Sequence, residues 1–203
     1  AAKEAGVKPI IGLETYVSAR RMTDRDPQRD KHSYHLVLLA ENDKGYKNLL
    51  KIASAGQLEG FYYYPRVDHE FLAAHSEGLI ATTSCMSGEV PRTILEKGSD
   101  AGRLKLDWYY ETFGPNNFFV ELQNHNIPEL HQINKTLLEL GKRYNANFIA
   151  TNDVHYIERA DARYQDILLA IQTGALLSDP NRMKMTGDTY YLRSPQEMAS
   201  LFP

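Results

Sequence analysis

The sequence predicts an α/β fold built on a parallel sheet that is open or closed as a barrel. Short apolar runs alternate about five times with stretches of helical period, and the links between them are short. Hydrophobic residues make up 42% of the 203 residues and charged residues 24%, as in globular domains that bury a core. The sequence contains no apolar run near the roughly 20 residues that span a bilayer.

Five stretches have the composition of strands, because they are apolar and end at polar or turn residues: 9–17, 34–40, 78–84, 118–123 and 148–150. A further short strand is predicted at 190–192. Seven stretches have a helical pattern: 46–56, 68–75, 89–96, 101–113, 128–144, 160–172 and a last one after Ser194. Asp68 and Ser194 suit helix caps, and Pro128 and Pro195 suit first helical positions.

Two connecting segments lack any period. Residues 20–32 are charged and contain Pro27, which predicts a mobile loop whose four arginines face solvent or contact a phosphate backbone. Residues 61–64 are all aromatic and lie close to Arg66. Such rings either pack a loop onto the body of the domain or stack on bases.

The strand at 148–150 is predicted to be buried, and Asp153 and His155 follow it. If the extended backbone continues, their side chains project to the same side. A carboxylate and an imidazole at the end of a strand suit a divalent metal such as zinc. They also suit a general acid and base, and the Asn152-Asp153 pair is common in turns.

Other polar candidates recur near strand ends. Glu14, Cys85 and His125 lie at or just beyond the ends of their strands, whereas His35 opens its strand. A lone cysteine is usually inert, but a thiolate at this position is a metal ligand or a nucleophile. The carboxyl ends of barrel strands form the active face, so these residues predict a metal site suited to phosphoester hydrolysis.

Charge and cysteine content restrict the partners and the compartment. The formal net charge of -3 argues against a broad attraction to nucleic acid and leaves room for a local basic patch. One cysteine forms no internal disulfide, which fits a reducing, cytoplasmic setting. Residues 1–9 look like the end of a helix followed by entry into a strand, which predicts an N-terminally truncated piece of a longer polypeptide.

Four blocks together resemble the polymerase and histidinol phosphatase (PHP) family: 10–16, 34–40, 84–89 and 150–156. Residues 45–49 and 179–182 are similar to one branch of it, the domain at the start of bacterial replicative DNA polymerase III alpha subunits. The resemblance covers essentially the whole chain, and the order and spacing of the blocks make it specific.

This resemblance implies a distorted (β/α)7 PHP barrel, here incomplete because its first strands are missing. It implies a barrel segment at 1–158 and a C-terminal connector at 159–203 that leads toward the polymerase core. It further implies a cluster of up to three divalent metal ions, zinc first and manganese or iron as alternatives. The family's ligand blocks contain Glu14, His35, Cys85, Asp153 and His155, with Asp153 and His155 also catalytic, and His125 is a nearby candidate.

The implied activity is metal-dependent 3′–5′ exonuclease or phosphoesterase chemistry within a DNA-directed DNA polymerase. The implied partners are DNA and the other subunits of the polymerase III holoenzyme, including a proofreading exonuclease subunit. Two alternatives stay open: a free-standing phosphatase of the histidinol-phosphate type, and a non-catalytic scaffold. The family's first block, which carries His-x-His, has no counterpart here, so we expect the chain alone to bind metal weakly and cleave DNA poorly.

Overall fold

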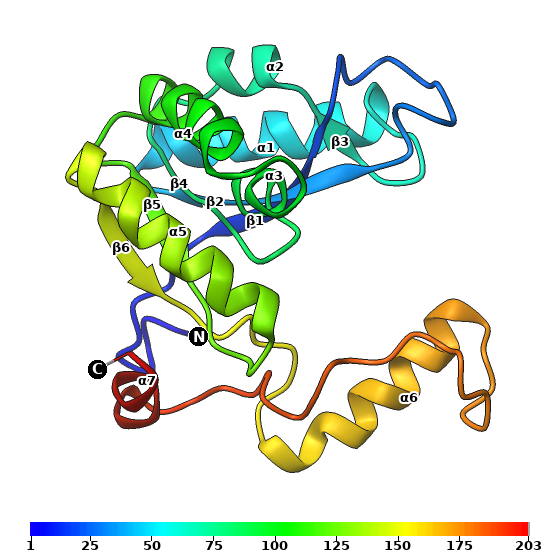
Figure 1. Cartoon of the computed structure of the whole chain (residues 1–203). Helices are drawn as coiled ribbons and strands as arrows, with labels where there is room; N and C mark the ends of the chain where they lie inside the picture. Colours follow the sequence, from blue (N-terminus) through cyan, green and yellow to red (C-terminus); the bar gives the residue numbers. More distant parts are fainter. Residues whose placement is uncertain (203) are drawn as a thin grey trace. The chain divides into compact units, whose positions relative to one another are not determined.

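A computed structural model describes residues 1–202 and leaves Pro203, the last residue of the predicted connector, outside the described part. The described residues form a mixed α/β fold with one six-stranded sheet, in the order β3-β1-β2-β4-β5-β6, and seven α-helices (Figure 1). The sheet is not closed, since β3 and β6 lie at its two edges. The predicted α/β class is confirmed, as a partial barrel.

The strands are β1 (Gly12–Ser18), β2 (Ser33–Ala40), β3 (Arg66–Val67), β4 (Leu79–Thr82), β5 (Phe118–Leu122) and β6 (Asn147–Ala150). The helices are α1 (Asp43–Leu58), α2 (His69–Ala74), α3 (Glu89–Lys97), α4 (Ser99–Phe113), α5 (Pro128–Tyr144), α6 (Ala162–Thr173) and α7 (Pro195–Leu201), with a 3-10 turn at Arg159–Asp161 before α6. The predicted helix at 128–144 has these bounds, and the short strand predicted at 190–192 is a single bridge between Tyr156 and Tyr191.

The described chain forms two compact units. The first consists of Ala1–Glu121 and Thr136–Phe148, and the second of Leu122–Lys135 and the residues from Ile149 onward. β5, α5 and β6 each contribute residues to both units. None of the helices between residues 1 and 202 is long and apolar enough to cross a membrane.

Strand direction differs from the expected parallel sheet at β2. β2 runs antiparallel to both of its neighbours, β1 and β4, whereas β1 with β3 and β4 with β5 are parallel. Residues 19–32 join β1 to β2 without a helix, and an antiparallel neighbour needs no helical crossover. The first residues of β2 therefore lie beside the last residues of β1 and β4, along the same border of the sheet.

One face of the sheet in the first unit is covered by helices. Leu13, Leu38, Ala81 and Phe118 are successive register partners, so their side chains share a face. Helix α1 packs beside Leu13, and Tyr109 of α4 stacks on the Phe118 ring with centroids 5.1 Å apart. In Figure 1, α1, α2 and α4 lie on one side of β1 and β2.

The opposite face of the same strands carries the polar candidates. Because side chains alternate along a strand, the residues between the covered positions point the other way. They are Glu14, Tyr16, His35, Val37, Leu39, Ile80, Thr82, Phe119 and Glu121.

The strand predicted to be buried at 148–150 is exposed. All four residues of β6 are exposed, Phe148 and Ile149 among them. β6 is the last strand in the order of the sheet, so it has a neighbouring strand on one side. An apolar run alone does not distinguish an edge strand from a central one, which is why this prediction is wrong.

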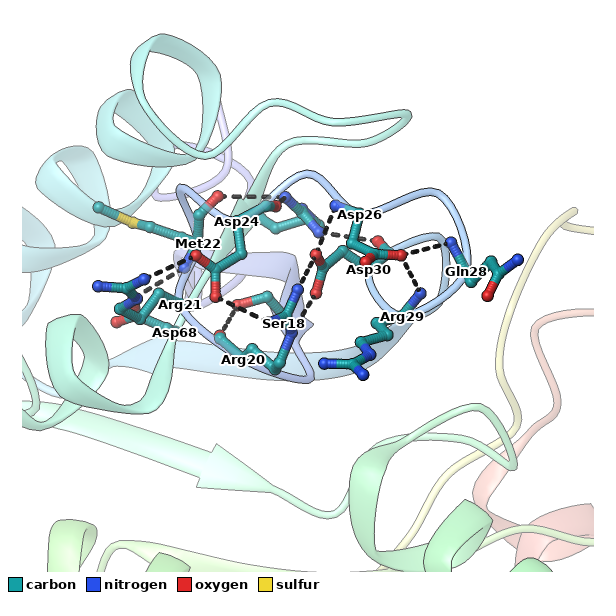
Figure 2. A network of polar contacts seen from close by, with 11 residues as sticks. Ser18, Arg20, Arg21, Met22, Asp24, Asp26, Gln28, Arg29, Asp30 and Asp68 are labelled. Carbon is teal, nitrogen blue, oxygen red and sulfur yellow. Dashed lines mark hydrogen bonds and ion pairs between the residues drawn. The ribbon is translucent and has the colours of Figure 1, made fainter.

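The segment at 20–32, predicted to be a mobile loop, is tied together by polar contacts (Figure 2). The carboxylate of Asp30 is buried and accepts hydrogen bonds from Arg20 Nε and Nη2 at 2.9 and 2.6 Å. It also accepts one from the backbone of Asp26 at 2.7 Å. These contacts join the two ends of the loop, and the pairing with Arg20 lowers the pKa of Asp30.

Arg66 on β3 holds the same loop through hydrogen bonds to its backbone. Its side chain is 1% exposed and donates four hydrogen bonds of 2.8 to 3.2 Å to backbone carbonyls. The acceptors are Gly60, Asp30, Met22 and Asp24. A buried guanidinium with this many carbonyl acceptors is part of the fold, since it satisfies groups that water does not reach.

A second buried ionic cluster joins α2, α3 and α4. Glu89 at the start of α3 is 2% exposed, and its carboxylate lies 2.7 Å from His69 Nε2 and 2.6 Å from Lys105 Nζ. Tyr109 donates a third hydrogen bond to it at 3.0 Å. Burial raises the pKa of Glu89, but the contacts with His69 and Lys105 outweigh burial and lower it overall.

Candidate metal centre

Three of the predicted ligands lie in direct contact in the first unit. His35 Nδ1 is 2.8 Å from Glu14 Oε1 and 3.5 Å from Cys85 Sγ. Glu14 is in the middle of β1, His35 is near the start of β2, and Cys85 follows β4. Elements far apart in the sequence therefore bring a carboxylate, an imidazole and a thiol together.

The antiparallel direction of β2 explains why His35 opens its strand and still reaches the other two. Tyr16 is the register partner of His35, so Glu14 lies two residues away on the same face. If β2 ran parallel to β1, the first residues of β2 would lie beside the start of β1, and His35 would be far from the residues that follow the ends of β1 and β4.

The turn that carries Cys85 is held against the start of β2. His35 donates its backbone N–H to Ser87 O at 3.1 Å and pairs with Gly88 in an isolated bridge. Gly88 has no room for a side chain, because a Cβ there would lie 2.1 Å from Thr83 O. The backbone, not only the side chains, positions Cys85 beside His35.

The electrostatics of this trio favour a charged imidazole. Hydrogen bonds to Cys85 and Glu14 raise the pKa of His35 to about 10, although partial burial opposes the shift. Burial and the nearby Glu14 raise the pKa of Tyr16 as well. At neutral pH the metal-free chain therefore carries a protonated His35, whose Nδ1 lies against the carboxylate of Glu14.

The donor types of this trio fit zinc better than its spacing does. Carboxylate, imidazole and thiolate are all zinc ligands, and two of them around one tetrahedral ion lie about 3.4–3.6 Å apart. The separation of Sγ and Nδ1, 3.5 Å, has this value, whereas that of Oε1 and Nδ1, 2.8 Å, is a hydrogen bond that would have to lengthen. As they stand, the described side chains include no group of three or more His, Cys, Asp and Glu residues that could hold a metal ion.

The other predicted ligands belong to the second unit. His155 is exposed, and its Nδ1 lies 2.6 Å from the carbonyl oxygen of Asp153. The backbone of Asp153 is left-handed, with φ of 43°, so the chain is not extended there. The side chains of Asp153 and His155 therefore do not follow the alternation of an extended strand that the sequence predicts.

His125, the additional candidate ligand, is a buried histidine of the second unit with one ring nitrogen unpaired by any described residue. It is 6% exposed, and its ring stacks on Tyr190 with centroids 4.1 Å apart. Its Nδ1 lies 2.9 Å from Thr189 Oγ1, while its buried Nε2 has no hydrogen-bond partner within the described chain. An orphaned imidazole nitrogen suits a metal ion or a water molecule.

Acid is expected to destabilise the chain through His125. Burial, Arg193 and His155 lower its pKa to about 4, below the 6.5 of an unperturbed histidine. The unfolded chain thus binds more protons between these two values, so the free energy of unfolding falls as the pH drops from about 6.5 to about 4, by up to about 3 kcal/mol. Urea titrations of wild type and His125→Gln across this range measure the effect. A wild-type slope equal to that of the variant would contradict it.

Sequence reasoning missed one acidic residue on the same sheet face. Glu121 in β5 is buried and accepts a hydrogen bond from Thr82 at 2.5 Å. Like Glu14, it stands in an apolar strand. A carboxylate within an apolar strand therefore indicates a candidate site residue at both positions.

Residues 1–125 match the family model of the PHP domain, which is more than half of the chain, so the chain belongs to the PHP domain family. It is 44% identical over 99% of its length to the DNA polymerase III subunit alpha of Borreliella burgdorferi. It is 42% identical to the subunits of that name from Thermus aquaticus, over 98% of its length, and Mycobacterium tuberculosis, over 99%. The chain spans only 18%, 16% and 18% of these three relatives. The predicted family resemblance is confirmed.

Proposed function

We propose that this chain is the PHP region of a bacterial replicative DNA polymerase and works in DNA replication in the cytoplasm. The proposal is supported by its similarity, from end to end, to relatives named DNA polymerase III subunit alpha. Residues 1–158 are the barrel segment and 159–203 the connector toward a polymerase core. DNA and the other holoenzyme subunits, including a proofreading exonuclease, are the proposed partners.

Five residues are proposed to hold divalent metal, with zinc as the first choice and manganese or iron as alternatives: Glu14, His35, Cys85, Asp153 and His155. One observation carries this proposal, the meeting of Glu14, Cys85 and His35 from three separate elements. His125 is an additional candidate, because its buried Nε2 lacks a partner among residues 1–202.

The proposed chemistry is hydrolysis of the terminal phosphodiester of a DNA strand, in the 3′–5′ direction. A bound divalent metal would lower the pKa of a coordinated water molecule and would place positive charge beside the phosphate oxygens. The carboxylate of Asp153 is suited to accept the proton of the attacking water. His155 donates its Nδ1–H to the carbonyl oxygen of Asp153, so its Nε2 remains for the site. That nitrogen is suited to bind metal or, when protonated, to donate a proton to the leaving oxygen.

Asp153→Asn in the full-length protein tests this function. We expect nuclease activity to fall about 100-fold or more, as for loss of an acid–base group, with folding and nucleotide addition retained. Asp179→Asn, at an exposed position in the same unit, serves as the matched control and should leave the nuclease unchanged. Unchanged nuclease activity in Asp153→Asn would refute the catalytic role, whereas loss of folding would indicate a structural metal.

A non-catalytic scaffold that stabilises the polymerase and docks a proofreading subunit is the second candidate. It is favoured by the 2.8 Å separation of His35 Nδ1 and Glu14 Oε1, which is shorter than the roughly 3.4 Å between two ligands of one tetrahedral ion. Chelation separates the two candidates: a scaffold of this kind keeps its fold and its partner in EDTA, and a nuclease loses activity. The free-standing phosphatase is disfavoured, because the similarity to polymerase subunits covers 98–99% of the chain, including the residues after 160.

A further inference from the structure

Four consecutive aromatic residues, Phe61 to Tyr64, form a ledge before β3. Phe61, Tyr63 and Tyr64 are 49%, 55% and 50% exposed. Tyr62 meets Tyr63 edge-on at 4.6 Å, and the Arg66 guanidinium lies over the Tyr62 ring at 5.2 Å. The sequence allowed such rings to pack inward, but in the structure three of the four remain about half open to solvent.

The backbone of the aromatic ledge is held in an unusual conformation. Tyr63 has a φ of 60°, in the left-handed region that bulky residues rarely adopt. The N–H of Tyr62 donates to Tyr64 O at 3.1 Å across this tight turn. The turn therefore presents neighbouring rings outward, and strain of this kind is retained where surrounding structure enforces it.

Tyr64 connects the aromatic ledge to the candidate metal centre. Its ring stacks on Tyr16 with centroids 4.8 Å apart and planes at 24°. Tyr16 in turn meets the His35 ring edge-on at 5.1 Å. The path from Tyr64 through Tyr16 to His35 is thus short. A strand of a few stacked nucleotides, at about 3.4 Å each, would reach from Tyr64 to the three candidate ligands.

The loop beside the aromatic ledge is basic. Residues 20–31 contain five Lys and Arg side chains against three Asp. Arg25 donates to Glu59 O, two residues before the aromatic ledge, and Arg66 connects the ledge to the loop carbonyls of Met22 and Asp24. Arg25, Arg29 and Lys31 are exposed. Exposed rings and exposed cations together match the two faces of a single nucleic-acid strand, its bases and its phosphates.

We propose that the aromatic ledge is a stacking subsite for single-stranded DNA, in which Tyr64 holds a base near the strand end beside Glu14, His35 and Cys85. The inference rests on the proposed function, since it names how that site holds its substrate. Tyr64 is a positioning residue: it stacks on a base and takes no part in bond cleavage. Stacking is indifferent to base identity, so the subsite accepts any sequence.

The test is binding of a fluorescein-labelled oligothymidine to the 203-residue chain in EDTA, so that no cleavage occurs. A backbone of the same length without bases is the second probe. Tyr64→Ala is compared with Tyr64→Phe, which keeps the ring, and with Tyr46→Ala, which removes a tyrosine of similar exposure on α1. Thermal unfolding of each variant confirms that it is folded.

We expect Tyr64→Ala to weaken oligothymidine binding about tenfold, the effect of one lost base–aromatic stack. Tyr64→Phe and Tyr46→Ala should bind as wild type, and the abasic probe should be insensitive to all three substitutions. Equal binding by Tyr64→Ala and wild type, or no binding of oligothymidine by the wild-type chain, would overturn the subsite. The nuclease assay of Asp153→Asn is independent of both results, so failure of the subsite leaves the proposed function standing and failure of the nuclease leaves the binding result standing.

Discussion

Arg66→Met is expected to lower the free energy of unfolding by about 4 kcal/mol, the largest effect of any single substitution proposed for this chain. The variant leaves four backbone carbonyls, those of Gly60, Asp30, Met22 and Asp24, without their donor. Water does not reach a site at which the arginine is 1% exposed. Chemical denaturation followed by circular dichroism measures the change.

Arg21→Met is the matched control for this prediction. Its side chain is 77% exposed and pairs with Asp24 at 3.1 Å in the same loop. Exposed pairs of this kind contribute less than about 1 kcal/mol. If the two substitutions had similar effects, Arg66 would not be the support of the loop that its hydrogen bonds indicate.

Glu89→Ala is expected to cost about 3 kcal/mol, since it removes the shared partner of His69, Lys105 and Tyr109. Lys105 is partly exposed and regains water, which limits the loss. Because the pKa of Glu89 is lowered in the folded chain, its contribution is present above the pKa of an unfolded Glu and is lost as the pH falls through the folded value. Urea titrations at neutral and acidic pH measure both effects.

Glu96→Ala, on the same helix α3, separates burial from charge in this experiment. Glu96 pairs with Arg92 one turn earlier and is about half exposed. We expect a change below about 0.5 kcal/mol at neutral pH. A cost for Glu96→Ala as large as that for Glu89→Ala would mean that the buried cluster contributes little of its own.

The helices and most strands follow from local patterns, and the sequence predicted them. Helix 128–144 is recovered because Pro128 starts it and its apolar stripe continues without interruption. Asp68 and Ser194 cap their helices through their side chains as expected. Capping and periodicity act within a few residues, so a single sequence contains the whole signal.

Strand direction and edge position depend on partners far away in the sequence. β2 has the same apolar pattern whether it runs parallel or antiparallel to β1, and β6 has the same pattern whether it is central or at an edge. The identity of Glu14, His35 and Cys85 as candidates was visible in the sequence. Their contact depends on the reversal of β2, which only the pairing register reveals.

Arg66 and His125 show the same limit for single side chains. Arg66 follows an aromatic run in the sequence, and no local pattern indicates that its side chain is buried against residues 20–32. The partners of His125, Thr189 and Tyr190, lie more than sixty residues away. Long-range polar contacts of this kind have no periodic signature.

The ion pair between Arg20 and Asp30 closes the base of the loop between β1 and β2, and this has a practical consequence for protein engineering. The register of β1 with β2 is set by backbone pairing outside the segment that this ion pair closes. Extra residues inserted at the exposed turn around Gln28 therefore leave Glu14 and His35 in place. Lengthening a loop costs only about 0.6 kcal/mol for each doubling of its length. An affinity tag or a fluorescent reporter can therefore be built into the interior of this chain at that turn.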